Sequence, residues 1–184
     1  MLTTTQDVKT YLGIVGSGEE DLITLLVKLA SQAIKTIAGW EIEKATYSNQ
    51  RIDGGDAIIR LKAKPIDPTG FVIQLNNGTV GVPRWVDMLT SNYVLHLDEG
   101  VVEQIVPLDG ILNLQLTYTA GYATIPADLE LLCIELVARM YNKRKSEGIS
   151  SEGMESVNVT YATELLTEFD KAIIEQYKLA HFVI

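Results

Sequence analysis

The sequence predicts an α+β protein in which a helical bundle, built from N-terminal and C-terminal helices, carries an inserted antiparallel β region. Three observations predict this class. Apolar residues follow a helical period up to residue 41, short β-branched segments divided by turn signals occupy 42–120, and a helical period returns in 121–184. We expect 1–184 to form a single domain, because 184 residues of which 47% are hydrophobic can bury one core.

Two helices are expected in the first region, 1–41. Asp7–Leu12 follows a threonine-rich cap and ends at Gly13. A second helix starts at the acidic turn Glu19–Asp21, where carboxylates oppose the positive end of the helix dipole, and it ends at Gly39. Its apolar residues recur at steps of three and four, which predicts one core-facing stripe. That stripe comprises Leu22, Leu25, Leu26, Leu29, Ala33 and Ile37, widened by Ile23, Ala30 and Ile34.

The middle region, 42–120, contains four strand candidates rich in β-branched or aromatic residues. The last of them alternates polar and apolar residues, so one of its faces should be buried. Closely spaced turn signals between the candidates predict antiparallel hairpins in a small barrel or sandwich. The candidates are Ala57–Leu61, Gly70–Leu75, Asn92–Leu97 and Leu112–Tyr118.

The acidic segment Asp53–Asp56 has a superficial likeness to a calcium loop. It lacks the regular acidic spacing and the closing glutamate of such a loop. We therefore expect a hairpin turn there.

Pro126 opens a long helix, at a position where its missing N–H costs nothing. One stripe of this helix, from Leu129 to Met140, predicts a core face. A second apolar stripe lies on the same helix, and a helix that is apolar on two sides must be covered on two sides. We expect a neighbouring subunit to supply the second cover, with the β region as the alternative. The candidate interface residues are Leu131, Ile134, Ala138 and Tyr141.

The rest of the C-terminal region, 121–184, is predicted to contain a mobile loop over 146–162, rich in serine, glycine and glutamate, and then a helix from about Thr163. One face of that helix should carry Leu165, Leu166, Phe169, Ala172, Ile173, Tyr177 and Ala180. The chain finishes on an apolar segment that we expect to dock on its own fold or on a partner. The docking residues would be Phe182, Val183 and Ile184.

Composition excludes several function classes. The formal net charge is −9, and no basic stripe is present, so specific nucleic-acid binding is not expected. The single Cys133 cannot form a disulfide framework and sits in an apolar stripe, where a small buried side chain is the ordinary role. No signal peptide and no apolar run of about 20 residues are present. We therefore expect a protein made in the cytoplasm, with no membrane contact.

Motif searches give no catalytic constellation. Gly13, Gly16 and Gly18 do not match a phosphate-binding spacing, and the acidic residues that follow would repel a phosphate. His96 and His181 lie in different regions, with His96 expected on the exposed side of a strand. We predict no enzymatic activity, no cofactor and no metal.

The junction between the last strand candidate and the long helix carries a resemblance to a known family. Tyr118–Tyr122 reads Tyr-Thr-Ala-Gly-Tyr, and Ile125–Leu129 reads Ile-Pro-Ala-Asp-Leu. This pattern resembles the head–tail connector (adaptor) proteins of tailed bacteriophages and prophages. The N-terminal helices before Trp40 and the β-region segments Leu61–Ile66 and Tyr93–Gly100 agree with it, so the resemblance covers most of the chain.

The resemblance implies a structural virion protein at the head–tail junction. It implies a ring of identical subunits, a dodecamer in the virion, that contacts the portal protein on one side and stopper or tail proteins on the other. DNA would then pass through the ring as cargo. Two alternatives stay open from the sequence: another morphogenesis component, such as a stopper or tail terminator, or a small α+β hydrolase or nucleotide-binding enzyme.

Overall fold

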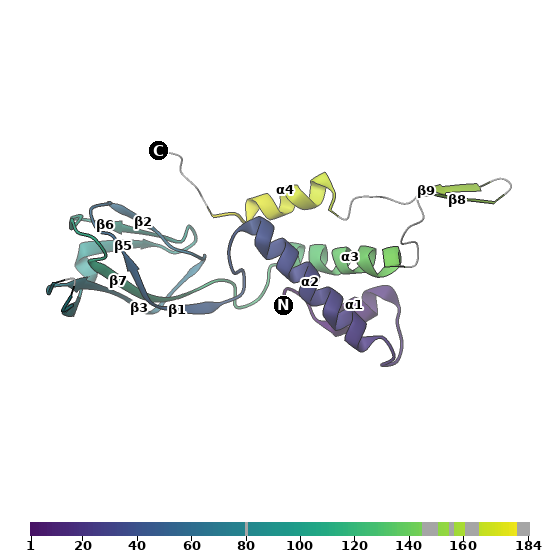
Figure 1. Ribbon diagram of the computed structural model, residues 1–184, viewed down its shortest axis with the longest axis horizontal. Coiled ribbons are helices and arrows are strands. Elements are labelled where there is room, and N and C mark those ends of the chain that lie inside the picture. Colours follow the sequence, from purple (N-terminus) through teal and green to yellow (C-terminus); the bar gives the residue numbers. More distant parts are fainter. Residues whose placement is uncertain (80, 145–150, 155–156, 161–165, 180–184) are drawn as a thin grey trace. The chain divides into compact units, whose positions relative to one another are not determined.

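The computed structural model describes residues 1–79, 81–144, 151–154, 157–160 and 166–179. These residues confirm the predicted α+β class, with helices at both ends of the chain and antiparallel sheets between them (Figure 1). The chain divides into two compact units, one formed by Met1–Gly39 with Ile125–Lys178 and the other by Trp40–Thr124. Each unit has its own buried core.

The helical unit contains α1 (Thr5–Leu12), α2 (Glu20–Ala38), α3 (Ala127–Lys143) and α4 (Glu168–Gln176). The expected glycine ends of α1 and α2 are confirmed, because Gly13 and Gly39 adopt left-handed conformations with φ of 68° and 83°. Helices α2 and α3 pack against each other, and the Oγ atom of Ser31 lies 3.6 Å from Sγ of Cys133 across that contact. Figure 1 shows α1 and α4 on opposite sides of the α2–α3 pair.

The β unit contains two antiparallel sheets. The four-stranded sheet has the order β1-β7-β3-β4, and the three-stranded sheet has the order β2-β6-β5. The strands are β1 (Ala45–Ile52), β2 (Ile58–Arg60), β3 (Ile66–Asn76), β4 (Trp85–Asp87), β5 (Tyr93–His96), β6 (Val101–Gln104) and β7 (Leu114–Ala120), and a 3₁₀ turn, η1 (Thr90–Asn92), precedes β5.

Aromatic rings join the two sheets. Phe71 of β3 lies 5.8 Å from Tyr93 of β5 and 6.2 Å from Tyr118 of β7, measured between ring centroids. Tyr118 is fully buried, and its hydroxyl oxygen accepts a hydrogen bond from the backbone N–H of Lys62 at 3.2 Å. The predicted buried face of the last strand is confirmed at Leu114, Leu116 and Tyr118, but the strand starts two residues later than predicted, and Leu112 is exposed.

Three predictions about the β region need correction. The segment Asp53–Asp56 is not a hairpin turn, because it joins β1 of one sheet to β2 of the other. Strands β1, β4 and β6 were not among the sequence candidates. The predicted loop 146–162 contains a two-stranded antiparallel hairpin, β8 (Ser151–Met154) with β9 (Val157–Thr160), and its other residues lie outside the described ones.

Gly121 positions the junction motif that carried the resemblance. Its φ is 103°, and a Cβ at this position would lie 2.5 Å from the carbonyl oxygen of Glu43. Its N–H donates to the carbonyl of Pro65 at 2.9 Å, and the next residue, Tyr122, donates to Ile42 at 2.8 Å. Only glycine fits a backbone that passes so close to another in this conformation.

Candidate assembly surfaces

The second stripe predicted on α3 is divided in the structure. Leu131 is 49% exposed and Ile134 is half-buried, whereas Ala138 and Tyr141 are buried. The stripe therefore has an outer half that is available to another molecule and an inner half that is covered within the chain.

The Tyr141 hydroxyl donates to Oε2 of Glu19, the residue that precedes α2. Nη2 of Arg144 lies 3.2 Å from the other Glu19 carboxylate oxygen, and its guanidinium lies 4.5 Å above the Tyr141 ring. The hydrogen bond to the Glu19 carboxylate, with burial, raises the pKa of Tyr141. These contacts tie the C-terminal end of α3 to the N-terminal end of α2.

The core-facing stripe predicted for α2 is wrong in its centre. The buried residues of α2 are Ile23, Val27, Ala30, Ser31, Ile34 and Ala38. Leu25 and Leu29 are instead 53% and 50% exposed, and their neighbours Leu22, Leu26 and Ala33 are half-buried. We call Leu22, Leu25, Leu26, Leu29 and Ala33 the leucine strip. It is an apolar helix face that the described part of the chain covers only in part, with Leu25 and Leu29 in solvent.

Helix α4 is held by a buried carboxylate rather than by a broad apolar face. Asp170 is 2% exposed, and its two oxygens accept from Arg139 of α3 and, at 2.7 Å, from the backbone N–H of Thr167. Burial tends to raise the pKa of Asp170, but the hydrogen bonds from Arg139 and Thr167 outweigh it and hold the pKa below its usual range. Ile174 is the one fully buried apolar side chain of this helix.

The apolar face predicted for the last helix is only partly correct. Ile173 and Tyr177 are half-buried, but Phe169 is 74% exposed and Ala172 also faces solvent. The helix begins at Glu168 because Thr167 and Asp170 form a reciprocal capping box. Of the other residues assigned to this face, Leu165 and Ala180 lie outside the described residues, as do the predicted docking residues Phe182, Val183 and Ile184.

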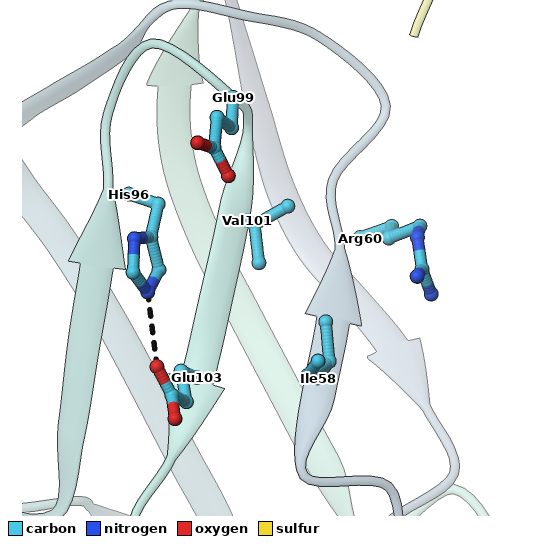
Figure 2. A pocket seen from close by; sticks show the side chains of 6 residues that line it. All are labelled: Ile58, Arg60, His96, Glu99, Val101 and Glu103. Carbon is cyan, nitrogen blue, oxygen red and sulfur yellow. Dashed lines mark hydrogen bonds and ion pairs between the residues drawn. The ribbon is translucent and has the colours of Figure 1, made fainter. Parts of the chain in front are cut away.

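A depression of about 460 Å³ lies on the outer face of the three-stranded sheet (Figure 2). Nε2 of His96 lies 3.0 Å from Oε2 of Glu103 across this face, and His96 is half-exposed as predicted. The other lining residues are Ile58, Arg60, Glu99 and Val101. The lining thus offers an acid, a base and a cation, but no serine, threonine or cysteine that could act as a nucleophile.

Exposed apolar residues also gather in the loops that follow β4 and β6. Ile111 and Leu112 belong to the loop between β6 and β7, as do Ile105 and Val106, and all four are exposed. Leu112 has φ of 47°, and its N–H donates to Oδ1 of Asp53 at 2.7 Å. This hydrogen bond ties the loop at Leu112 to the segment that follows β1, while the apolar side chains of the loop face solvent.

The single cysteine and the two tryptophans of the chain have structural roles. Cys133 is buried beside Ser31, as predicted, and burial raises the pKa of its thiol. Trp40 is buried against Tyr122, and Trp85 lies under the guanidinium of Arg51 at 5.3 Å.

In the described part of the chain, no three His, Cys, Asp or Glu side chains are grouped to hold a metal ion. Nor does any described helix have the length and hydropathy that crossing a bilayer requires.

Comparison with known proteins gives a family and a fold. A family model described as head completion protein matches residues 1–180. A solved structure of the virion of a native gene transfer agent particle contains a similar chain, with a TM-score of 0.58 and 15% identity over 97% of this chain and 90% of that one. A chain from the neck of an empty gene transfer agent particle computed with C6 symmetry gives a TM-score of 0.57 and 14% identity over the same shares. The comparison with curated proteins gives no match.

Proposed function

Because the chain belongs to the head completion protein family, we propose that it forms a closed ring of identical copies at the head–tail junction of a tailed phage or phage-like particle. Family membership confirms the resemblance to head–tail connector (adaptor) proteins and gives the chain a structural role in the virion. The ring, its position, its partners and its passage for DNA are the proposal. The portal protein and the stopper or tail proteins are the neighbours we expect on its two sides.

The helical unit supports the ring. A ring of copies needs two different surfaces on each copy, because every contact is head-to-tail. The unit has two such apolar surfaces, the leucine strip of α2 and the outer half of the α3 stripe at Leu131 and Ile134. A chain of the same fold belongs to a neck computed with C6 symmetry, and a twelve-membered ring is compatible with sixfold symmetry.

The charge of the chain supports passage of DNA rather than binding to it. The formal net charge is −9, and acidic residues outnumber basic ones by 24 to 15. A ring of such copies repels the phosphate backbone, so DNA can move through it without being retained. A specific DNA-binding protein would instead present a basic surface.

The proposal assigns no catalytic step to this chain. The observation that carries it is the family match over residues 1–180, together with two exposed apolar faces on one helical unit. We assign no second function to the depression at His96 and Glu103, where the two side chains form an exposed pair on the surface of the sheet.

Deleting the gene from its particle tests the proposal. We expect filled or emptied heads and free tails to accumulate without joining, and a plasmid copy of the wild-type chain to restore infectious or transducing particles. A plasmid copy with His96→Ala should restore them equally well, because no chemistry depends on that residue. Normal particle yield without the chain would contradict the proposal, and so would loss of complementation by His96→Ala in a folded protein.

A further inference from the structure

We infer that the leucine strip on α2 of one copy binds the Leu131–Ile134 face on α3 of the next copy, in a head-to-tail contact between copies of this chain. The inference rests on the proposed ring and names the two surfaces that would close it. The molecule that we expect on each surface is a second copy of this chain. Both surfaces are formed by described residues of the helical unit.

The exposed leucines of α2 lie on the side of the helix opposite its buried residues. Each residue of an α-helix is turned by about 100° around the helix axis from the one before it. Two side chains that are two positions apart therefore differ by about 200° and lie on nearly opposite faces. Leu25 is two residues from both Ile23 and Val27, which are buried, and Leu29 is two residues from both Val27 and Ser31. Leu25 and Leu29, the exposed members of the leucine strip, therefore face away from the buried side of α2.

Helix α3 repeats this arrangement in the opposite direction. Leu131 is two residues from Leu129 and from Cys133, and both of these are buried. Ser31 and Cys133 meet where α2 packs on α3. The buried sides of the two helices thus face each other, and their exposed leucines lie on opposite sides of the pair. Surfaces on opposite sides of a subunit cannot meet within one copy, but they can meet between successive copies.

Charge distinguishes the two surfaces and favours their pairing. Lys28 is exposed on α2, beside Leu25 and Leu29 in the strip. Glu130 and Glu135 lie on either side of the Leu131–Ile134 face of α3, and Glu135 is paired with Arg139 at 3.1 Å, so Glu130 supplies the negative charge of this rim. Two acidic α3 faces brought together would repel, whereas an α3 face brought to the α2 strip gains attraction at its rim. An apolar centre with a charged rim is the usual composition of a protein interface.

Cross-linking in assembled particles tests the contact. Particles carrying Leu25→Cys together with Leu131→Cys are treated with a short bifunctional maleimide and separated under denaturing conditions. We expect a ladder from dimer upward, because each copy would be joined to both neighbours. The native Cys133 is buried and its thiol has a raised pKa, so it is a poor competitor, and each single variant measures any reaction that it does give.

The controls separate the possible failures. Ile111→Cys with Leu131→Cys replaces the α2 position by an exposed apolar position that the proposed contact does not involve, and we expect no ladder. A dimer from Leu25→Cys alone would mean that α2 faces α2, and it would overturn the head-to-tail contact. A ring present in particles without a ladder would overturn the inference while leaving the proposed function intact. A cross-link to a different virion protein would also overturn it. Absence of the chain from particles would instead contradict the proposed function.

Charge reversal gives an independent readout. Lys28→Glu should lower the amount of assembled ring by about twofold to fivefold, as expected for a partly screened ion pair. Adding Glu130→Lys to the same chain should restore it. Failure of the second change to rescue the first, with both chains folded by circular dichroism, would contradict the pairing of these two rims.

Discussion

At the scale of single residues, the Asp170 carboxylate determines how α4 attaches to the rest of the helical unit. It is charged and almost fully buried, and it is held by Arg139 and by the capping box at Thr167. A carboxylate in such a site is stabilising only while these hydrogen bonds are made. The contact with Arg139 cannot be predicted from sequence, because Arg139 and Asp170 are 31 positions apart and no local pattern links them.

Replacing this carboxylate tests its role. Asp170→Asn should lower the free energy of unfolding by about 2 kcal/mol, because hydrogen bonds to a charged partner are lost. Glu168→Gln is the matched control on the same turn, where an exposed pair with Lys171 should contribute less than about 0.5 kcal/mol. Urea unfolding followed by circular dichroism gives both values. Equal effects of the two changes would contradict the role of Asp170.

The same carboxylate predicts a pH dependence. Its pKa is lower in the folded chain than in the unfolded one, so it stabilises the fold above the unfolded pKa of about 3.9. That contribution is lost as the pH falls through the lower, folded-state pKa. Unfolding free energies measured from pH 6 downward should therefore decline less steeply below pH 4 in Asp170→Asn than in the wild type. Parallel curves would show that Asp170 has an ordinary pKa in the folded protein.

The leucine strip shows why residue-level burial was only partly predictable. The apolar residues of α2 cover a wider sector than one neighbouring helix can bury, and the periodicity gives no sign of which part is covered. The sequence stripe was centred on Leu25 and Leu29, while the structure buries Ile23, Val27 and Ile34. For α3 the predicted core stripe is buried from Leu129 to Val137, but the predicted second stripe is exposed only at Leu131, because Ala138 and Tyr141 are buried within the chain. The hydrogen bond from Tyr141 to Glu19 could not be predicted, because the two residues are 122 positions apart in the sequence.

At the scale of elements, helix boundaries followed local chemistry and strands did not. Gly13, Gly39 and Pro126 mark helix ends at the predicted places. The start of α4 was misplaced, although Thr167 and Asp170 have the spacing of a capping box that would have located it. Strand β6 was missed because Val101, Val102 and Gln104 are all buried and show no alternation. Pairing between strands that are distant in sequence, as in β1 with β7, depends on contacts that local sequence does not encode.

The junction motif gives a prediction at this scale. Gly121→Ala should destabilise the β unit by about 3 kcal/mol or more, because a positive φ is combined with a Cβ that meets the backbone of Glu43. Gly70→Ala is the control, since Gly70 has φ of 76° but nothing within 4 Å of its Cβ position. It should cost only about 1 kcal/mol. Thermal unfolding separates the two, and similar losses would mean that the close approach at Gly121 is unimportant.

At the scale of the whole molecule, two units with separate cores carry different surfaces. The helical unit presents the leucine strip and the Leu131–Ile134 face, and the β unit presents apolar loops at Ile111 and Leu112. A net charge of −9 spreads over the chain as a whole. Composition and the junction motif were enough to predict the class of protein. Which surfaces remain exposed required the structure, because exposure depends on how many neighbours each helix has.

The net charge predicts weak interaction with DNA. The purified chain should not retain a 30-base-pair duplex in a gel-shift assay at about 150 mM salt, because its net charge of −9 repels the phosphate backbone. The assay should remain negative for the Lys28→Glu variant. Binding in the low micromolar range that weakens with added salt would contradict passage of DNA without retention.

Cryo-electron microscopy of the particle neck shows whether copies of this chain form a ring at the head–tail junction. We expect a closed ring of this chain, coaxial with the DNA path, with α2 of each copy against α3 of the next. Particles in which the chain lies elsewhere, is present in single copy, or is absent from the neck would contradict the proposed ring.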